Sequence, residues 1–172
     1  RDDADYIGYN DLQTYLNEAS YKMVDLIRYN YDTREDMFDS HSYAKGGRVL
    51  HMLRKYLGDD AFFAGLNLYL EKNKFQSVEI HDLRKAMEEV SGEDLSWFFN
   101  EWFLDKGHAE LSIYYEWFPE EDKLDITIYQ NQDTSVAPVY VIPMDVDFYY
   151  NGKVERKRIT LDRSMQTFSF NF

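Results

Sequence analysis

The spacing of apolar residues changes near Gly107, and this change limits the folds that the chain can adopt. Before Gly107, apolar residues recur at steps of three and four, which is the period of an amphipathic helix. After it, they alternate with polar residues, as in a strand with one buried face. The sequence therefore predicts an α+β chain in two parts. Residues 1–108 form a helical part, and residues 109–172 form an antiparallel β-sandwich.

Five helices are expected in the first part, each with an apolar stripe that faces a core. The first is expected to begin at Asn10 or Asp11, and its stripe continues to Ile27. The others are expected over residues 43–57, 59–70, 80–90 and 94–106. Glycines suit the ends of three of them, at Gly58, Gly92 and Gly107.

About five strands are expected in the second part, over residues 111–117, 124–128, 140–150, 154–161 and 168–172. Asn151-Gly152 indicates a hairpin turn, because both residues accept positive φ. Pro143 indicates a sheet edge or a bulge. Five strands are few for a two-sheet sandwich, and the last one stops in mid-pattern. We therefore expect an incomplete sandwich in a chain that is a piece of a longer protein.

Composition excludes several classes of partner. The formal net charge of -13 argues against binding to nucleic acid or to anionic lipid. No apolar run approaches the roughly 18 residues that a membrane span needs. The chain has no cysteine, which excludes disulfides and thiolate metal sites.

Known catalytic signatures are missing from the sequence. The four histidines include no pair four residues apart, so there is no H-E-x-x-H helix to bind zinc. There is also no G-x-S-x-G turn, no P-loop and no G-x-G-x-x-G. We assign no metal ligand, and the chain by itself carries no complete catalytic set.

Two adjacent glycines, Gly46 and Gly47, follow Tyr43 at the start of the second expected helix. Each glycine inside a helix costs roughly 1 kcal/mol relative to alanine. Such a pair is expected where another group approaches the helix backbone closely. That group is either a neighbouring helix, which the local pattern alone favours, or a reacting centre.

Several segments occur in an order that resembles the gluzincin zinc aminopeptidases, of which aminopeptidase N is typical. They are S-Y-A-K-G-G from Ser42, L-R-K-Y-L-G ending at Gly58, F-F-A-G-L-N-L-Y-L from Phe62, I-H-D-L from Ile80, S-G-E-D-L from Ser91 and F-F-N-E-W from Phe98. The resemblance covers about residues 40–148 and includes Gln130-Asn131-Gln132 as the end of a strand. Because separate segments occur in the right order, the resemblance is specific.

The resemblance implies a fold and one catalytic residue. The helical part is expected to be the C-terminal half of a thermolysin-like catalytic domain, followed by a small β-sandwich. In this family the tyrosine of Y-x-K-G helps to hold the oxyanion of the tetrahedral intermediate, and Tyr43 occupies that position. A phenol is protonated at neutral pH and can donate to a developing negative oxygen. We therefore expect Tyr43 to be catalytic, and assign no chemical role to His41 or Lys45.

The family's zinc ligands and general base precede this tyrosine, and the chain contains none of them. We therefore expect a piece of a zinc aminopeptidase that is inactive and binds no zinc by itself, while its longer parent binds Zn and peptide substrates. One alternative is a zinc-free relative that serves as a binding or scaffold module. Another is a self-contained interaction domain. Truncation would also leave an apolar face exposed, so we expect self-association.

Overall fold

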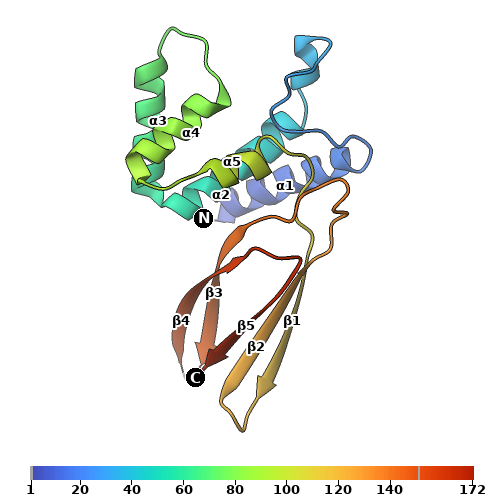
Figure 1. Cartoon of the computed structure of the whole chain (residues 1–172), viewed down its shortest axis with the longest axis vertical. Coiled ribbons are helices and arrows are strands. Elements are labelled where there is room, and N and C mark those ends of the chain that lie inside the picture. Colours follow the sequence, from blue (N-terminus) through green and yellow to red (C-terminus); the bar gives the residue numbers. More distant parts are fainter. Residues whose placement is uncertain (1, 151) are drawn as a thin grey trace. The chain divides into compact units, whose positions relative to one another are not determined.

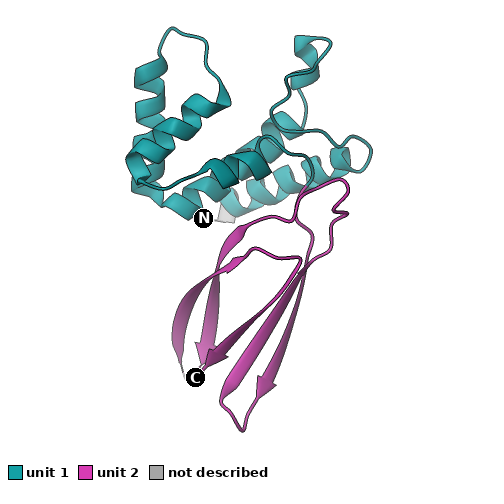
Figure 2. Cartoon of the chain, in the orientation of Figure 1, with its two compact units in different colours: residues 1–107 teal, residues 108–172 magenta. Residues whose placement is uncertain are grey.

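The computed structural model describes residues 2–150 and 152–172, which form two compact units (Figure 2). The first unit, residues 1–107, contains the helices, and the second, residues 108–172, contains antiparallel strands (Figure 1). The predicted α+β class is confirmed. None of the described helices is both long enough and apolar enough to cross a membrane.

The first unit consists of helices joined by short connections and one longer irregular segment. They are α1 (Asp2–Ala19), the 3-10 helix η1 (Arg34–Met37), the π-helix η2 (His41–Lys45), α2 (Gly46–Leu57), α3 (Asp59–Asn73), α4 (Ile80–Ser91) and α5 (Ser96–Trp102). The ends of α2 and α4 agree with the prediction. Gly58 and Gly92, which follow them, have φ values of +82° and +73°, which favour glycine.

The predicted start of α1 is wrong, because the helix begins at Asp2 rather than at Asn10 or Asp11. The additional turns are mostly exposed, and their large side chains Tyr6 and Tyr9 are exposed too. A helix segment without a buried stripe gives no periodic signal, so its presence could not be inferred from apolar spacing.

The predicted continuation of this helix to Ile27 is also wrong. The helix ends at Ala19, and the chain beyond it pairs with the end of the unit instead. The amide of Ile27 donates to the carbonyl of Phe103 at 2.9 Å, and Asp25 forms an antiparallel bridge with Lys106. Apolar spacing alone does not separate a helix from an irregular segment that buries one side.

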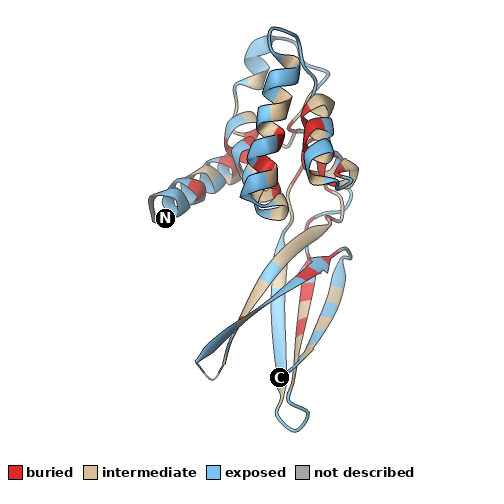
Figure 3. Cartoon of the chain, turned by 90° about the vertical axis from the view of Figure 1, so that its left-hand side faces the viewer, coloured by how far each residue is buried: buried red, intermediate tan, exposed pale blue. Residues whose placement is uncertain are grey.

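The buried residues of the first unit, which are red in Figure 3, include the aromatic residues of α5 and of the position after it. Phe98, Phe99, Trp102 and Phe103 are all buried, and the rings of Phe99 and Phe103 stack with centroids 4.7 Å apart. The helix itself is shorter than the predicted range of 94–106, since it spans Ser96–Trp102.

The second unit contains two antiparallel sheets. The strands are β1 (Leu111–Phe118), β2 (Lys123–Gln130), β3 (Ile142–Tyr150), β4 (Lys153–Leu161) and β5 (Met165–Asn171). One sheet has the order β1-β2-β5, and the other is the β3-β4 pair. Pro143 pairs with Thr160 in the two-stranded sheet, so it lies on an edge strand as predicted. The predicted turn at Asn151-Gly152 falls in part on a residue outside the described ones, while Gly152 has a φ of +72°.

The inner faces of β2, β3 and β4 share one buried core, formed by Ile126, Ile128, Phe148, Ile159 and Leu161. Two buried glutamines at the end of β2 organise the loop that follows. The side chain of Gln130 donates to the carbonyl of Tyr140 at 2.8 Å and accepts from its amide at 2.9 Å. Gln132 donates to Gln130 at 2.9 Å and to the carbonyl of Pro138 at 2.8 Å. These residues of the Q-x-Q segment therefore have a structural role.

Candidate functional site

Tyr43 lies in the middle of the π-helix η2, which leads directly into α2. The amide of Lys45 donates to the carbonyl of Ser40 at 2.9 Å, and the amide of Gly46 donates to the carbonyl of His41. These bonds span five residues instead of the four of an α-helix. Because π-helical turns are rare and are frequently found at functional sites, this turn marks a candidate site.

The side chain of Tyr43 is exposed, whereas its neighbours in the turn are buried. Tyr43 is 65% exposed, while His41 is 0% exposed and Lys45 is 4% exposed. The ring of Phe38, which is also exposed, lies 6.1 Å from the ring of Tyr43. Among the described residues, no hydrogen-bond partner holds the Tyr43 hydroxyl. The turn therefore presents a free phenol at the surface of the first unit.

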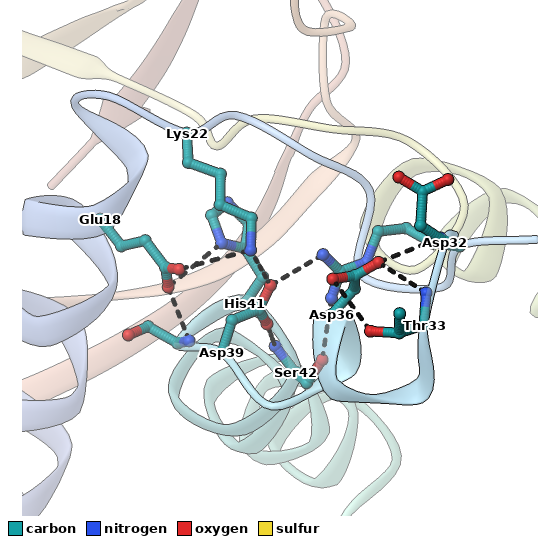
Figure 4. A network of polar contacts seen from close by, with 10 residues as sticks. Glu18, Lys22, Asp32, Thr33, Asp36, Asp39, His41 and Ser42 are labelled. Carbon is teal, nitrogen blue, oxygen red and sulfur yellow. Dashed lines mark hydrogen bonds and ion pairs between the residues drawn. The ribbon is translucent and has the colours of Figure 1, made fainter. Parts of the chain in front are cut away.

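A network of charged side chains surrounds the start of this turn (Figure 4). Asp39 Oδ2 accepts from Lys22 Nζ at 2.6 Å and from an Arg28 guanidinium nitrogen at 2.8 Å. Its other oxygen, Oδ1, accepts from the amide of Ser42 at 2.8 Å. A second nitrogen of Arg28 donates to Ser42 Oγ at 3.2 Å. One carboxylate thus joins two cations to the backbone of the turn.

Glu18, near the end of α1, contacts the same region. Its Oε2 accepts from the amide of Ser40 at 2.6 Å and lies 3.5 Å from His41 Nδ1. The imidazole of His41 packs edge-on against the ring of Tyr15, with centroids 5.1 Å apart. Neither ring nitrogen of His41 has a hydrogen-bond partner among the described residues. His41 is therefore a core residue of the turn.

Burial and hydrogen bonding set the charges in this network. Burial by itself would raise the pKa of Asp39, but the hydrogen bonds from Lys22, Arg28 and Ser42 outweigh it and hold the pKa well below its usual range. The pKa of Glu18 is lowered in the same way, because hydrogen bonds from Ser40 outweigh its burial. Burial also lowers the pKa of His41. At neutral pH the network therefore contains two carboxylates, two cations and a neutral imidazole.

Glu18, Asp39 and His41 could provide three metal ligands, since one ligand atom of each lies within 4.8 Å of the others. They do not fit zinc as they stand. Lys22 and Arg28 already occupy one oxygen of Asp39, and backbone amides occupy its other oxygen and one of Glu18. A dication here would be repelled by the two cations and would have to displace these donors. We therefore assign this cluster to the structure of the turn.

Lys45, which follows the tyrosine in Y-x-K-G, is buried beneath the turn. Its Nζ has no hydrogen-bond partner among the described residues and lies 5.8 Å from the centre of the Tyr15 ring. Burial lowers its pKa to about 8, although the carboxylates of Asp25 and Asp105 act in the opposite direction. The ammonium is therefore stabilised by two distant charges and one aromatic face.

The surroundings of Gly46 and Gly47 do not show the tight helix packing that the local sequence pattern favours. A Cβ built on Gly47 would meet nothing within 4 Å, and one built on Gly46 would make only ordinary contacts of 3.8 Å with His41 and Leu26. Close packing instead occurs at Gly65 in α3, where a Cβ would lie 2.5 Å from the sulfur of Met87. Packing within the described residues therefore does not explain Gly47.

Sequence reasoning selected Tyr43 as the candidate residue, which stays a prediction, and missed the network around it. Lys22 and Arg28 lie in an irregular segment, so no helical or strand period connects them with Asp39. The π-helical form of the turn was missed too, because apolar spacing over five residues cannot distinguish it from an α-helical turn. One local signal was available in the sequence. Asp39 precedes Tyr43 by four residues, a spacing at which its backbone carbonyl can accept from the amide of Tyr43.

Comparison with known proteins places this site in a family. Residues 5–102, more than half of the chain, match the peptidase family M1 domain. The chain belongs to peptidase family M1. The matched residues include the whole of η2 and its charged network. The predicted resemblance to aminopeptidases of the aminopeptidase N type is confirmed.

Individual M1 relatives support this assignment. Aminopeptidase N of Lactococcus lactis subsp. lactis is 43% identical over 82 residues, which cover 47% of this chain and 10% of that protein. Probable aminopeptidase 1 of Sulfurisphaera tokodaii is 30% identical over 141 residues, which cover 80% of this chain and 17% of that protein.

A solved structure shows the same fold. The crystal structure of Legionella pneumophila aminopeptidase A in complex with aspartic acid matches with a TM-score of 0.74 and 20% identity, over 94% of this chain and 19% of that one. The chain thus spans less than a fifth of the length of each of these relatives.

Proposed function

We propose that this chain is part of a zinc-dependent aminopeptidase that removes N-terminal residues from peptides. The M1 match supports the class of reaction, because the relatives that it aligns with are named as aminopeptidases. The chain's own contribution is Tyr43. Its phenol donates a hydrogen bond to the oxygen that becomes negative when water attacks the scissile carbonyl.

The observation that carries this proposal is the combination of an exposed phenol with a π-helical turn. A buried tyrosine that only packs would have its ring covered, whereas the ring of Tyr43 is largely open to solvent. A hydroxyl that no described residue engages is available to a ligand. Donors of this kind are effective because they are already in place when charge develops on the substrate.

In this proposal, the residues that bind zinc lie outside this chain. The only group of three possible ligands among the described residues is the Glu18–Asp39–His41 cluster, and hydrogen bonds already occupy both oxygens of Asp39 and one oxygen of Glu18. When bound to the longer protein, zinc supplies an activated water and polarises the carbonyl. Tyr43 contributes separately, because its hydroxyl donates one hydrogen bond to the oxygen on which negative charge develops.

The test is Tyr43→Phe in the longer protein that contains this chain. The change removes one hydroxyl and keeps the ring. A lost oxyanion donor typically lowers kcat by about 100- to 1000-fold. KM is expected to change little, because the interaction forms only as charge develops.

Tyr29→Phe is the matched control, because Tyr29 is 64% exposed in the same unit, close to the 65% of Tyr43. Its kcat is expected to stay within about two-fold of the unmodified protein, since the Tyr29 hydroxyl makes none of the hydrogen bonds described for the turn and its network. Near-normal kcat for Tyr43→Phe, with zinc present, would remove Tyr43 from the mechanism. Absence of zinc and activity from the longer protein would favour the zinc-free binding module instead.

A further inference from the structure

Asp39 bonds two consecutive amides at the start of η2, one through its side chain and one through its backbone. Its Oδ1 accepts from the amide of Ser42 at 2.8 Å, and its carbonyl accepts from the amide of Tyr43 at 3.1 Å. The first amides of any helix have no acceptor within it and need one from outside. The bond to Tyr43 uses the backbone, which every residue has, whereas the bond to the preceding amide, that of Ser42, needs the carboxylate of Asp39.

The side chain of Asp39 is itself fixed in place. It is 6% exposed, and it is held by Lys22 at 2.6 Å and by Arg28 at 2.8 Å. Arg28 also bonds the hydroxyl of Ser42, so it connects to the turn at a second point. Charge-assisted hydrogen bonds of this kind are shorter and stronger than those between neutral groups.

Tyr43 has few side-chain contacts of its own. Its ring is largely exposed, and the nearest aromatic ring, that of Phe38, is exposed as well. The position of the hydroxyl therefore depends on the backbone of η2 more than on packing around the ring. A change in the start of the turn would move the phenol.

We propose that Asp39 is a positioning residue for Tyr43, which fixes the π-helical turn so that the phenol meets the developing oxyanion. This inference rests on the proposed function. Asp39 touches neither substrate nor reacting atoms, and its side chain acts on the turn through the amide of Ser42 and through Arg28, which bonds the Ser42 hydroxyl. Because catalytic donors must be placed to within a fraction of an ångström, a displacement of about 1 Å can lower the rate by roughly 100-fold.

The experiment is a double-mutant cycle in the longer, zinc-loaded protein, with Asp39→Ala and Tyr43→Phe made singly and together. Asp39→Ala is expected to lower kcat at least ten-fold while zinc content and KM stay nearly unchanged. In the Tyr43→Phe background, the same substitution is expected to change kcat by less than two-fold. Residues that act through one another show this non-additivity, whereas independent structural effects add.

Asp36→Ala is the matched control. The side chain of Asp36 accepts two backbone amides, those of Asp32 and Thr33, but it does so at η1, and none of the hydrogen bonds found among the described residues joins it to η2. Its kcat is expected to stay within two-fold of the unmodified protein. If Asp39→Ala fails to fold, the cycle is run with Asp39→Asn, which keeps the volume and loses the ion pairs. A non-additive loss of at least three-fold is then expected.

The outcomes separate the two proposals. If Tyr43→Phe alone leaves kcat unchanged, the catalytic assignment of Tyr43 fails. If Tyr43→Phe lowers kcat but the Asp39 substitution has an equal effect in both backgrounds, or no effect in either, the positioning role of Asp39 is overturned and the assignment of Tyr43 stands.

Discussion

Replacing Gly47 with alanine is expected to stabilise this chain, although the same change at Gly65 is expected to destabilise it. Both glycines lie in helices, in α2 and α3 respectively, so both substitutions gain helix propensity. The difference lies in what the new methyl group meets. At Gly47 it meets nothing within 4 Å, and at Gly65 it meets the sulfur of Met87 at 2.5 Å and its Cα at 3.3 Å.

The magnitudes follow from these contacts. Alanine in place of an exposed helical glycine gains about 1 kcal/mol of unfolding free energy. For a chain of this size, that corresponds to an increase in melting temperature of about 2–4 °C. At Gly65 the same gain is opposed by overpacking against a fully buried methionine, which costs about 1–3 kcal/mol. The net change there is a loss of about 1 kcal/mol.

The assay is denaturant unfolding of the three chains, followed by the helical signal in circular dichroism. Gly47→Ala is expected to move the midpoint up and Gly65→Ala to move it down. An unchanged or lower denaturation midpoint for Gly47→Ala would refute the inference that the packing of this chain leaves room for a side chain at position 47. In the longer protein, we expect Gly47→Ala to lower kcat/KM, because a reacting centre is the other group that could approach the helix backbone at this glycine.

Three further predictions concern the buried lysine, the glutamine loop and the exposed face of α1. Burial lowers the pKa of Lys45 to about 8 from an ordinary value of 10.5, so the unfolded chain binds more protons between these values and stability rises with pH. From pH 7 to 9.5 the gain is about 2 kcal/mol, and Lys45→Met is expected to abolish it in denaturant titrations. Gln130→Met removes the two hydrogen bonds that the side chain makes with the amide and carbonyl of buried Tyr140, and is expected to cost about 2–6 kcal/mol in unfolding free energy, against less than about 1 kcal/mol for Gln166→Met. The chain is expected to self-associate through exposed side chains such as Tyr6 and Tyr9, which sedimentation at several concentrations would detect; a single monomeric species throughout would contradict this.

Apolar spacing predicted the parts of the fold that bury one face. The ends of α2 and α4 and the alternating strands β2 and β5 were accessible in this way, because each has a regular contrast between more and less exposed positions. Strand β1 was predicted from the same alternation of residue types, although most of its residues are exposed. The start of α1 was not accessible, since its first turns are almost fully exposed. The segment around Ile27 misled the prediction because it buries apolar residues without forming a helix.

The site divides along similar lines. Tyr43 could be identified because a short motif surrounds it in the sequence. Its supporting network could not, because Lys22, Arg28 and Asp39 come together through the tertiary path of an irregular segment. Their identity as partners depends on the fold of residues 20–40, where apolar spacing indicates a helix up to Ile27 that does not form and gives no prediction beyond it. The emptiness beside Gly47 likewise became visible only in three dimensions.

The five-residue hydrogen bonds of η2 depend on the number of residues in the turn more than on the identity of those residues. Each residue of an α-helix advances the chain by about 100° around the axis. Deleting a single residue between His41 and Lys45 would regularise the turn and rotate everything before it by about that angle relative to Val49 and Leu53, which anchor α2 in the core. Such a deletion would preserve the buried stripe of α2 and misdirect the segment that carries Asp39. We therefore expect substitutions to be tolerated in this turn more readily than insertions or deletions.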